Sequence, residues 1–259
     1  MTRNRPVPDV SPEDRQFIRS LIVYEDDDLI AFNKPSGLPV QDGRGITRSL
    51  DSLLDAFARS NGKRPRLVHR LDAGTSGIVI VAKTQPAAAC LSAEFSERRT
   101  RKTYLAIVGG NLPSENSGMF DAPLIKVQEA GRVRMIAARG DRKGALASRT
   151  GWDLLERCEG CGMMRLFPET GRMHQIRIHL ANAGCPIFGD AIYGNGRQDG
   201  PRLMLHAVSL EIRKPSGGVL AVKADIPADF TGIAEGLGFG AYSSEASFPF
   251  VHASGRLDR

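Results

Sequence analysis

Short apolar runs separated by turn signals dominate the first third of the chain. Residues 21–24 and 29–32 are two apolar segments joined by the acidic stretch 25–28, which predicts a β-hairpin. Residues 33–39 contain two prolines and a glycine, so they predict a rigid loop without regular structure. Residues 78–82 are apolar throughout and rich in β-branched side chains, as is typical of a strand buried on both faces.

Two segments in this part of the chain show helical signals instead. Between residues 50 and 57, leucine and phenylalanine recur at positions i, i+3, i+4 and i+7, which predicts a helix capped by Ser49 or Thr47. Pro86 suits the first turn of a second helix, which we expect to run to about Glu97.

The remainder of the chain contains further strands and one more helix. Thr170 is expected to cap a helix from about Arg172 to Asn182, and Gly184 to end it. Because strands and helices mix without a regular βαβ order, the fold class predicted is α+β, with a mixed, largely antiparallel sheet flanked by helices. The additional strands are expected at residues 104–108, 152–156, 163–167, 203–212 and 219–224.

The ends of the chain look less ordered than its middle. We expect one folded domain over residues 21–230, an irregular N-terminal arm over 1–20 and a loose, Gly- and Ser-rich tail over 231–259. The first ten residues lack the apolar segment of a secretory signal, and no apolar run approaches the roughly 20 residues that span a bilayer. A cytoplasmic protein that does not contact the membrane is therefore expected.

The formal net charge of +6 and the pI of about 9.3 are compatible with a polyanionic partner, because Lys and Arg neutralise phosphates. A mildly basic protein without any nucleic-acid role would show the same values. Basic residues are concentrated in the poorly patterned stretch 111–150. They are Lys126, Arg132, Arg134, Arg139, Arg142, Lys143 and Arg149.

The four cysteines are expected to be thiols, as in other proteins of reducing compartments. Cys158 and Cys161 have the spacing of half a zinc site, but no second pair accompanies them and a structural zinc site needs four ligands. We therefore expect a turn with two incidental thiols and no metal site.

The sharpest chemical motif is His-Arg-Leu-Asp-Ala-Gly-Thr-Ser-Gly at residues 69–77, directly before the predicted buried strand. Asp72 lies in a polar loop with a rigid exit, which could present a carboxylate to a ligand. The same residues also fit an ordinary turn in which Asp72 and Thr75 bond only to nearby backbone.

Two more segments carry candidate chemistry. On a helix, His174 and Arg177 share a face, whereas His179 lies five positions from His174 and so misses the spacing of four that a two-histidine zinc site requires. We expect Arg177 to pair with a carboxylate elsewhere, and the histidines to support the site or contact phosphate; a solvated basic helix is the alternative. Tyr104 opens a strand, where it could pack half-buried or stack on an extruded base.

Taken together, these segments resemble the RluA-type pseudouridine synthases. The resemblance covers roughly residues 21–226, and its strength lies in several motifs occurring in order. The motifs are Asn-Lys-Pro-Ser-Gly at 33–37, His-Arg-Leu-Asp at 69–72 with Thr-Ser-Gly at 75–77, Arg-Lys-x-Tyr at 101–104, Gly-Arg-x-His-Gln-x-Arg-x-His at 171–179, Gly-Asp-x-x-Tyr-Gly at 189–194 and Leu-His-Ala at 205–207.

The resemblance implies a cofactor-independent and metal-independent isomerase with a central catalytic cleft, acting on a stem-loop of rRNA or tRNA. Separately from the resemblance, we expect a monomer. It implies that Asp72 is the catalytic carboxylate, that Arg177 keeps it ionised and that Tyr104 lies against the uracil. The implied RNA contacts are Arg70, His69, Lys102, Arg172 and His174.

Two departures from the family pattern bear on the choice of RNA. Many members carry an N-terminal S4 domain, whereas only about 20 residues precede the first motif, and the tail after about residue 230 matches no family motif. One alternative is a non-catalytic RNA-binding or ribosome-assembly protein on the same scaffold. Another is a glycoside or nucleoside hydrolase that pairs Asp72 with Glu169 or Asp190.

Overall fold

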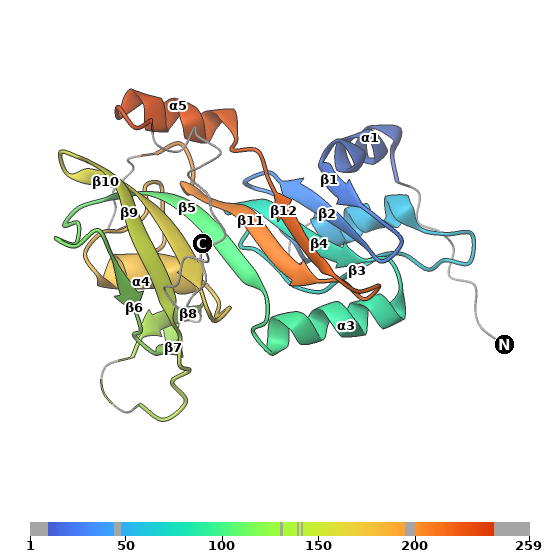
Figure 1. The fold of residues 1–259 in the computed structure, drawn as a ribbon, viewed down its shortest axis with the longest axis horizontal. Coiled ribbons are helices and arrows are strands. Elements are labelled where there is room, and N and C mark those ends of the chain that lie inside the picture. Colours follow the sequence, from blue (N-terminus) through green and yellow to red (C-terminus); the bar gives the residue numbers. More distant parts are fainter. Residues whose placement is uncertain are drawn as a thin grey trace. The chain divides into compact units, whose positions relative to one another are not determined.

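The structure, a computed structural model, describes residues 10–43, 48–129, 132–138, 140, 142–194 and 200–240, without the side chains of residues 129, 132 and 133 (Figure 1). The chain divides into two compact units. Unit 1 comprises the chain up to Thr100 together with Ala207–Asp225, and unit 2 comprises Arg101–His206 and the chain from Ile226 onward. Helices accompany largely antiparallel strands in both units, which confirms the α+β prediction.

Unit 1 is built on a sheet in the order β1-β2-β4-β11-β12, with the short β3 beside β4. The predicted hairpin is present as the antiparallel pair β1 and β2. All seven residues of β4 are buried, and successive side chains enter two different cores. Ile78 and Ile80 pack with helix α3 (Gln85–Ser96), whereas Val79 and Val81 pack with helices α1 (Pro12–Ser20) and α2 (Leu50–Leu53). The strands are β1 (Ile22–Glu25), β2 (Leu29–Lys34), β3 (Arg66–Leu67), β4 (Ser76–Ala82), β11 (Leu205–Arg213), whose residues from 207 onward belong to this unit, and β12 (Val219–Lys223).

The helices of unit 1 are α1 (Pro12–Ser20), α2 (Leu50–Leu53) with the 3₁₀ turn η1 (Leu54–Phe57), and α3 (Gln85–Ser96). The last two lie where the sequence predicted them. Ser49 caps α2 in a reciprocal capping box with Ser52, whereas the alternative cap Thr47 lies outside the described residues.

Helix α1 corrects the prediction of an irregular arm for residues 12–20. Ser11 caps the helix by accepting the Asp14 N–H, and Pro12 occupies its first turn. Ile18 is buried in the core beside α2, so this short amphipathic segment gains its stability from tertiary packing.

Unit 2 contains a sheet in the order β5-β10-β9-β6 and a separate hairpin of β7 and β8. Strands β6, β7 and β8 all fall within 111–150, where the hydrophobic pattern predicted none. Helices α4 (Gln175–Asn182) and α5 (Ala228–Gly236) contribute Ile176, Leu180 and Phe230 to the core that packs on β5, β9 and β10. The elements are β5 (Arg101–Gly109), β6 (Ser117–Phe120), β7 (Leu124–Glu129), β8 (Arg132–Ala137), β9 (Thr150–Cys158), β10 (Cys161–Pro168), α4 (Gln175–Asn182) and α5 (Ala228–Gly236).

Helix α4 begins three residues later than predicted. His174 precedes it in the left-handed backbone region (φ 56°), which interrupts a continuous helix from Arg172. Thr170 does not cap the helix; its hydroxyl donates to the Gln175 side-chain oxygen (2.6 Å). The predicted end is correct, because Gly184 follows with φ 85°.

The predicted tail is also more ordered than expected as far as residue 240. Helix α5 continues to Gly236, and Phe239 is buried in the core of unit 2. Residues 241–259 lie outside the described part of the chain. Among the helices that are described, none combines the length and apolar character needed to cross a membrane.

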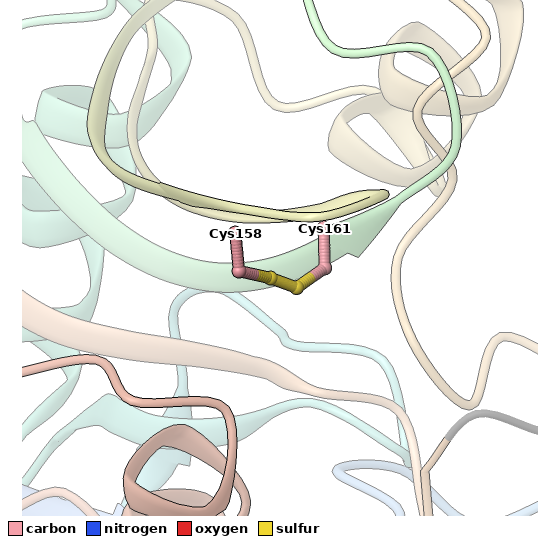
Figure 2. Close-up of a disulfide and its surroundings, with 2 residues drawn as sticks. All are labelled: Cys158 and Cys161. Carbon is pink, nitrogen blue, oxygen red and sulfur yellow. A yellow bond between two sulfur atoms is a disulfide. The ribbon is translucent and has the colours of Figure 1, made fainter.

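Cys158 and Cys161 form a disulfide, so the prediction of two thiols is wrong for this pair (Figure 2). They are directly opposed at the end of the β9–β10 hairpin, whose turn contains Gly160 with φ 68°. Their Cα atoms are 5.1 Å apart, within the range that a disulfide bridges. Cys90 and Cys185 are free thiols.

Candidate active site

Asp72 lies half-buried in a turn that leads directly into the buried strand β4. The Thr75 N–H donates to the Asp72 carbonyl (3.1 Å), which closes the turn. Gly77 has φ 112°, and a Cβ at this position would overlap the carbonyl of Ala207. Only glycine therefore fits the exit of the turn, and the path of the Asp72 loop is closely constrained.

The Asp72 loop is tied to the preceding Asn-Lys-Pro-Ser-Gly loop by a fully buried lysine. The Lys34 ammonium donates to the carbonyls of Pro35 (3.0 Å), Leu38 (2.8 Å) and Ala73 (3.1 Å). Three N–H donors meet three carbonyls, which provides the polar partners that a buried ammonium requires.

Two further hydrogen bonds join the same two loops. The Ser36 hydroxyl donates to the Gly74 carbonyl (2.7 Å), and the Gly37 N–H donates to the Ala73 carbonyl (2.8 Å). The residues on the C-terminal side of Asp72 are thus held by backbone and side-chain donors alike, which fixes the loop that carries the carboxylate.

His69 and Arg70 differ in their surroundings, although they are adjacent. The Ile80 N–H donates to His69 Nε2 (2.9 Å), and the imidazole stacks on Phe95 with ring centroids 4.2 Å apart. Because a backbone amide can only donate, His69 Nε2 carries no proton in this contact. Arg70 is exposed and donates to the Gln41 side-chain oxygen (3.4 Å).

Arg177 and Asp190 form a buried bidentate ion pair in unit 2. Arg177 Nε lies 2.8 Å from Asp190 Oδ2, and Nη2 lies 2.7 Å from Oδ1. The side chains are 8% and 1% exposed. The predicted pairing of Arg177 with a carboxylate elsewhere is confirmed for Asp190.

The ion pair also keeps Asp190 ionised. Burial by itself raises the pKa of Asp190, but the Arg177 hydrogen bond and charge, together with the N–H groups of Tyr193 and Ile192, lower the pKa below its ordinary value.

Tyr193 connects this pair to helix α4 and strand β8. The guanidinium groups of Arg177 and Arg134 lie 5.2 and 5.1 Å from the centroid of the Tyr193 ring. The Tyr193 hydroxyl donates to the Met135 carbonyl (3.2 Å), so it accepts from His174 Nδ1 (3.0 Å). His174 is therefore held within the protein through its Nδ1 atom.

The remaining predicted residues of unit 2 lie on β5 and just before α4. Tyr104 is half-buried opposite Leu166 of β10 and packs against the core. Lys102, two residues earlier on β5, is half-buried. Arg172 Nε donates to the Ala147 carbonyl (3.4 Å).

The predicted residues therefore divide between the two units. His69, Arg70 and Asp72 belong to unit 1, and Tyr104, Lys102, Arg172, His174 and Arg177 belong to unit 2. The ion pair of Asp72 with Arg177 that the resemblance implies would join the units and stays a prediction.

His179, the second histidine of the α4 motif, belongs to a buried polar network. Its Nε2 atom lies 3.0 Å from the Ala122 carbonyl and 3.1 Å from the Ser148 hydroxyl, and its Nδ1 atom lies 2.9 Å from the Thr150 hydroxyl. Burial lowers the pKa of His179, against smaller opposing effects of the Ala122 carbonyl and Asp121. The neutral ring links α4 to β9.

The sequence motifs indicate no separate role for Lys34, and they offer Asp190 only as the second carboxylate of a hydrolase. Each residue lies within a motif that was recognised. The sequence offers one signal for each residue: Lys34 ends an apolar strand directly before a proline, and Asp190 directly follows a glycine. Neither signal identifies the partner, because the Ala73 carbonyl is 39 positions from Lys34 and Arg177 is 13 positions from Asp190.

The family model and the sequence relatives of this chain all indicate the same protein family. The family model described as RNA pseudouridylate synthase matches residues 28–182. The chain is 36% identical over 212 residues to an uncharacterized RNA pseudouridine synthase of Zymomonas mobilis, covering 81% of this chain and 95% of that protein. It is 37% identical over 214 residues to the dual-specificity RNA pseudouridine synthase RluA of Escherichia coli, covering 81% and 94%.

A solved structure agrees with these sequence relatives. Human RNA Pseudouridylate Synthase Domain Containing 4 superposes with a TM-score of 0.72 at 25% identity, covering 87% of this chain and 97% of that one. The family match alone spans more than half of the chain. The chain therefore belongs to the RNA pseudouridylate synthase family, and its enzyme class is that of an RNA pseudouridine synthase, an isomerase.

Proposed function

We propose that this chain converts specific uridines of rRNA or tRNA to pseudouridine, with Asp72 as the catalytic carboxylate and no cofactor. The observation that carries the proposal is the setting of Asp72, on a turn bonded to a buried lysine and leading into a buried strand. The reaction breaks the bond between uracil N1 and ribose C1′, turns the base and joins C5 to C1′. It involves no net redox change, so the proposed reaction needs no redox cofactor.

Asp72 is proposed to act as a carboxylate anion with a cation beside it. Arg177 is the proposed cation, because a guanidinium stays charged and can bind a carboxylate through two N–H groups. Asp72 then attacks C1′ of the ribose, attacks C6 of the base or removes a sugar proton to form a glycal. Tyr104 is proposed to lie against the uracil face and to assist the final deprotonation at C5.

The target uridine has to leave its stack to reach Asp72, at a cost of a few kcal/mol that is smaller in loops. Specific RNA readers favour single-stranded loops, so a stem-loop is the proposed substrate. Arg70, which is exposed two residues before Asp72, would fill the vacated position or hold a phosphate.

Lys102, Arg172 and His174 are further proposed contacts to the RNA, and the enzyme is proposed to act as a monomer. Exposed basic residues of unit 2 would bind the RNA backbone. These are Lys126, Arg142, Lys143 and Arg149, whereas Arg139 lies outside the described residues. We assign His69 to the support of the loop, because its ring already accepts the Ile80 N–H.

Replacing Asp72 with Asn tests the proposal on transcripts of rRNA and tRNA stem-loops. Asp72→Asn should abolish pseudouridine formation while the Kd for RNA stays near the wild-type value. Asp27→Asn, at an exposed carboxylate of the same unit, is the matched control and should remain active. Turnover by Asp72→Asn at the wild-type rate would contradict the assignment.

The same assay separates the alternative functions. A non-catalytic RNA-binding protein would bind the transcripts without forming pseudouridine. A hydrolase would release free uracil, which an isomerase does not. The bidentate pair with Arg177 argues against Asp190 as the second carboxylate of a hydrolase.

A further inference from the structure

We propose that Asp190 is a positioning residue that sets the orientation of the Arg177 guanidinium for the isomerase reaction. This role rests on the proposed function, in which Arg177 is the ionic partner of Asp72. Asp190 is not proposed to touch the substrate.

The first support is the geometry of the ion pair. Asp190 accepts from Nε and Nη2 of Arg177 at 2.8 and 2.7 Å, so two parallel hydrogen bonds fix the plane of the guanidinium. A guanidinium has five N–H donors, and this contact engages two of them. Three donors therefore remain for other acceptors, and their directions are set by the contact with Asp190.

The second support is that Asp190 is itself held in place. Its Oδ1 atom also accepts from the N–H groups of Ile192 (2.9 Å) and Tyr193 (3.0 Å). The preceding Gly189 has φ 69°, and a Cβ there would overlap the carbonyl of Arg202. The carboxylate cannot turn without breaking these bonds, so it is a rigid reference for Arg177.

The third support is an aromatic contact to the guanidinium from the same loop. Tyr193, three residues after Asp190, places its ring 5.2 Å from the Arg177 guanidinium carbon. One short segment thus contacts the guanidinium through both a carboxylate and an aromatic ring. An adjacent carboxylate weakens the positive field of Arg177, so the benefit of Asp190 to catalysis lies in orientation.

Asp190→Asn is the test, because Asn has nearly the same shape and can keep one oxygen for the Ile192 and Tyr193 amides. Its NH₂ group would then face Arg177 Nε–H, donor against donor. A misplacement of about 1 Å costs on the order of 100-fold in rate, so kcat should fall by about 100-fold while the Kd for RNA stays unchanged. Asp153→Asn is the control, since Asp153 accepts two hydrogen bonds from Arg165 in the same unit and should keep the wild-type kcat.

A double-mutant cycle separates positioning from general stability. Arg177→Lys removes the guanidinium that Asp190 orients. In the Arg177→Lys background, adding Asp190→Asn should therefore cause only a small additional loss of kcat. Equal losses of kcat in both backgrounds, a wild-type kcat for Asp190→Asn, or a loss confined to RNA affinity would each overturn the proposal. In all three cases the wild-type enzyme would still form pseudouridine. Absence of pseudouridine from the wild-type assay would instead reject the proposed function.

A second measurement decides the question if Asp190→Asn does not fold. The Arg177 Nε–H resonance of the wild-type protein, assigned by its loss in Arg177→Lys, can be followed by NMR. Slow exchange with solvent is expected in the free and RNA-bound enzyme, because Asp190 holds this proton in both. Rapid exchange in either state would overturn the proposal.

Discussion

Replacing Lys34 with Met should destabilise the protein and slow the reaction together, because this lysine joins the two loops around Asp72. Methionine has a similar length and no charge, so it removes the donors while filling much of the same space. The Ala73 carbonyl would keep the Gly37 N–H, whereas the carbonyls of Pro35 and Leu38 would lose the ammonium.

The expected loss in the free energy of unfolding follows from the carbonyls of Pro35 and Leu38. A buried polar group left without its partner costs about 1–3 kcal/mol, which gives an upper range of about 2–6 kcal/mol for two, because the Leu38 carbonyl is buried and the Pro35 carbonyl only partly so. Removing a buried charge also relieves a desolvation cost, which moves the expected loss toward about 2–3 kcal/mol. Such a loss lies below the total stability of about 5–15 kcal/mol, so the variant should still fold.

Urea unfolding followed by far-ultraviolet circular dichroism measures this loss, and pseudouridine formation on a stem-loop transcript measures the effect on kcat. Lys63→Met, at an exposed lysine of the same unit, should change the free energy of unfolding by less than about 0.5 kcal/mol. If Lys34→Met were as stable and as active as Lys63→Met, the reasoning about the loop anchor would be refuted.

Two further predictions concern histidines. His69→Phe keeps the stack on Phe95 but leaves the Ile80 N–H without its acceptor, so urea unfolding should show a loss of about 1–3 kcal/mol; wild-type stability would contradict this role. Burial lowers the pKa of His179 in the folded state below its ordinary 6.5, so the unfolded chain takes up the proton first and stability should fall as pH drops below about 6.5. Unfolding free energies measured between about pH 7 and 5 should decline less steeply in His179→Gln, and equal slopes would contradict the assignment.

Strong local patterns predicted much of unit 1. The apolar, β-branched run at 78–82 favours a buried strand, and the acidic turn between two apolar runs favours a hairpin. Helix α1 was missed because its single buried residue, Ile18, makes a weak pattern among polar neighbours. Its stability depends on packing that the local sequence does not contain.

Unit 2 was harder to predict for a related reason. The β7–β8 hairpin has no strict alternation of apolar and polar residues, and charged residues interrupt both strands, so its pairing shows only in three dimensions. The start of α4 depends on the left-handed backbone of His174, which a non-glycine residue rarely adopts. The disulfide depends on a hairpin register that opposes Cys158 and Cys161.

The candidate site likewise has parts that the sequence predicts and parts that it does not. Asp72 and Arg177 could be named from their motifs, since their residue types and order resemble the family. The contacts that hold them could not, because the Lys34 ammonium meets backbone carbonyls and carbonyls carry no sequence signature.

The catalytic role of Asp72 is tested most directly by mapping pseudouridine in cells. Carbodiimide sequencing of rRNA and tRNA would compare cells that lack the gene with the same cells expressing the wild-type chain or Asp72→Asn at equal levels. We expect specific pseudouridines to disappear without the gene, to return with the wild-type chain and to stay absent with Asp72→Asn. Their return with Asp72→Asn would contradict the account.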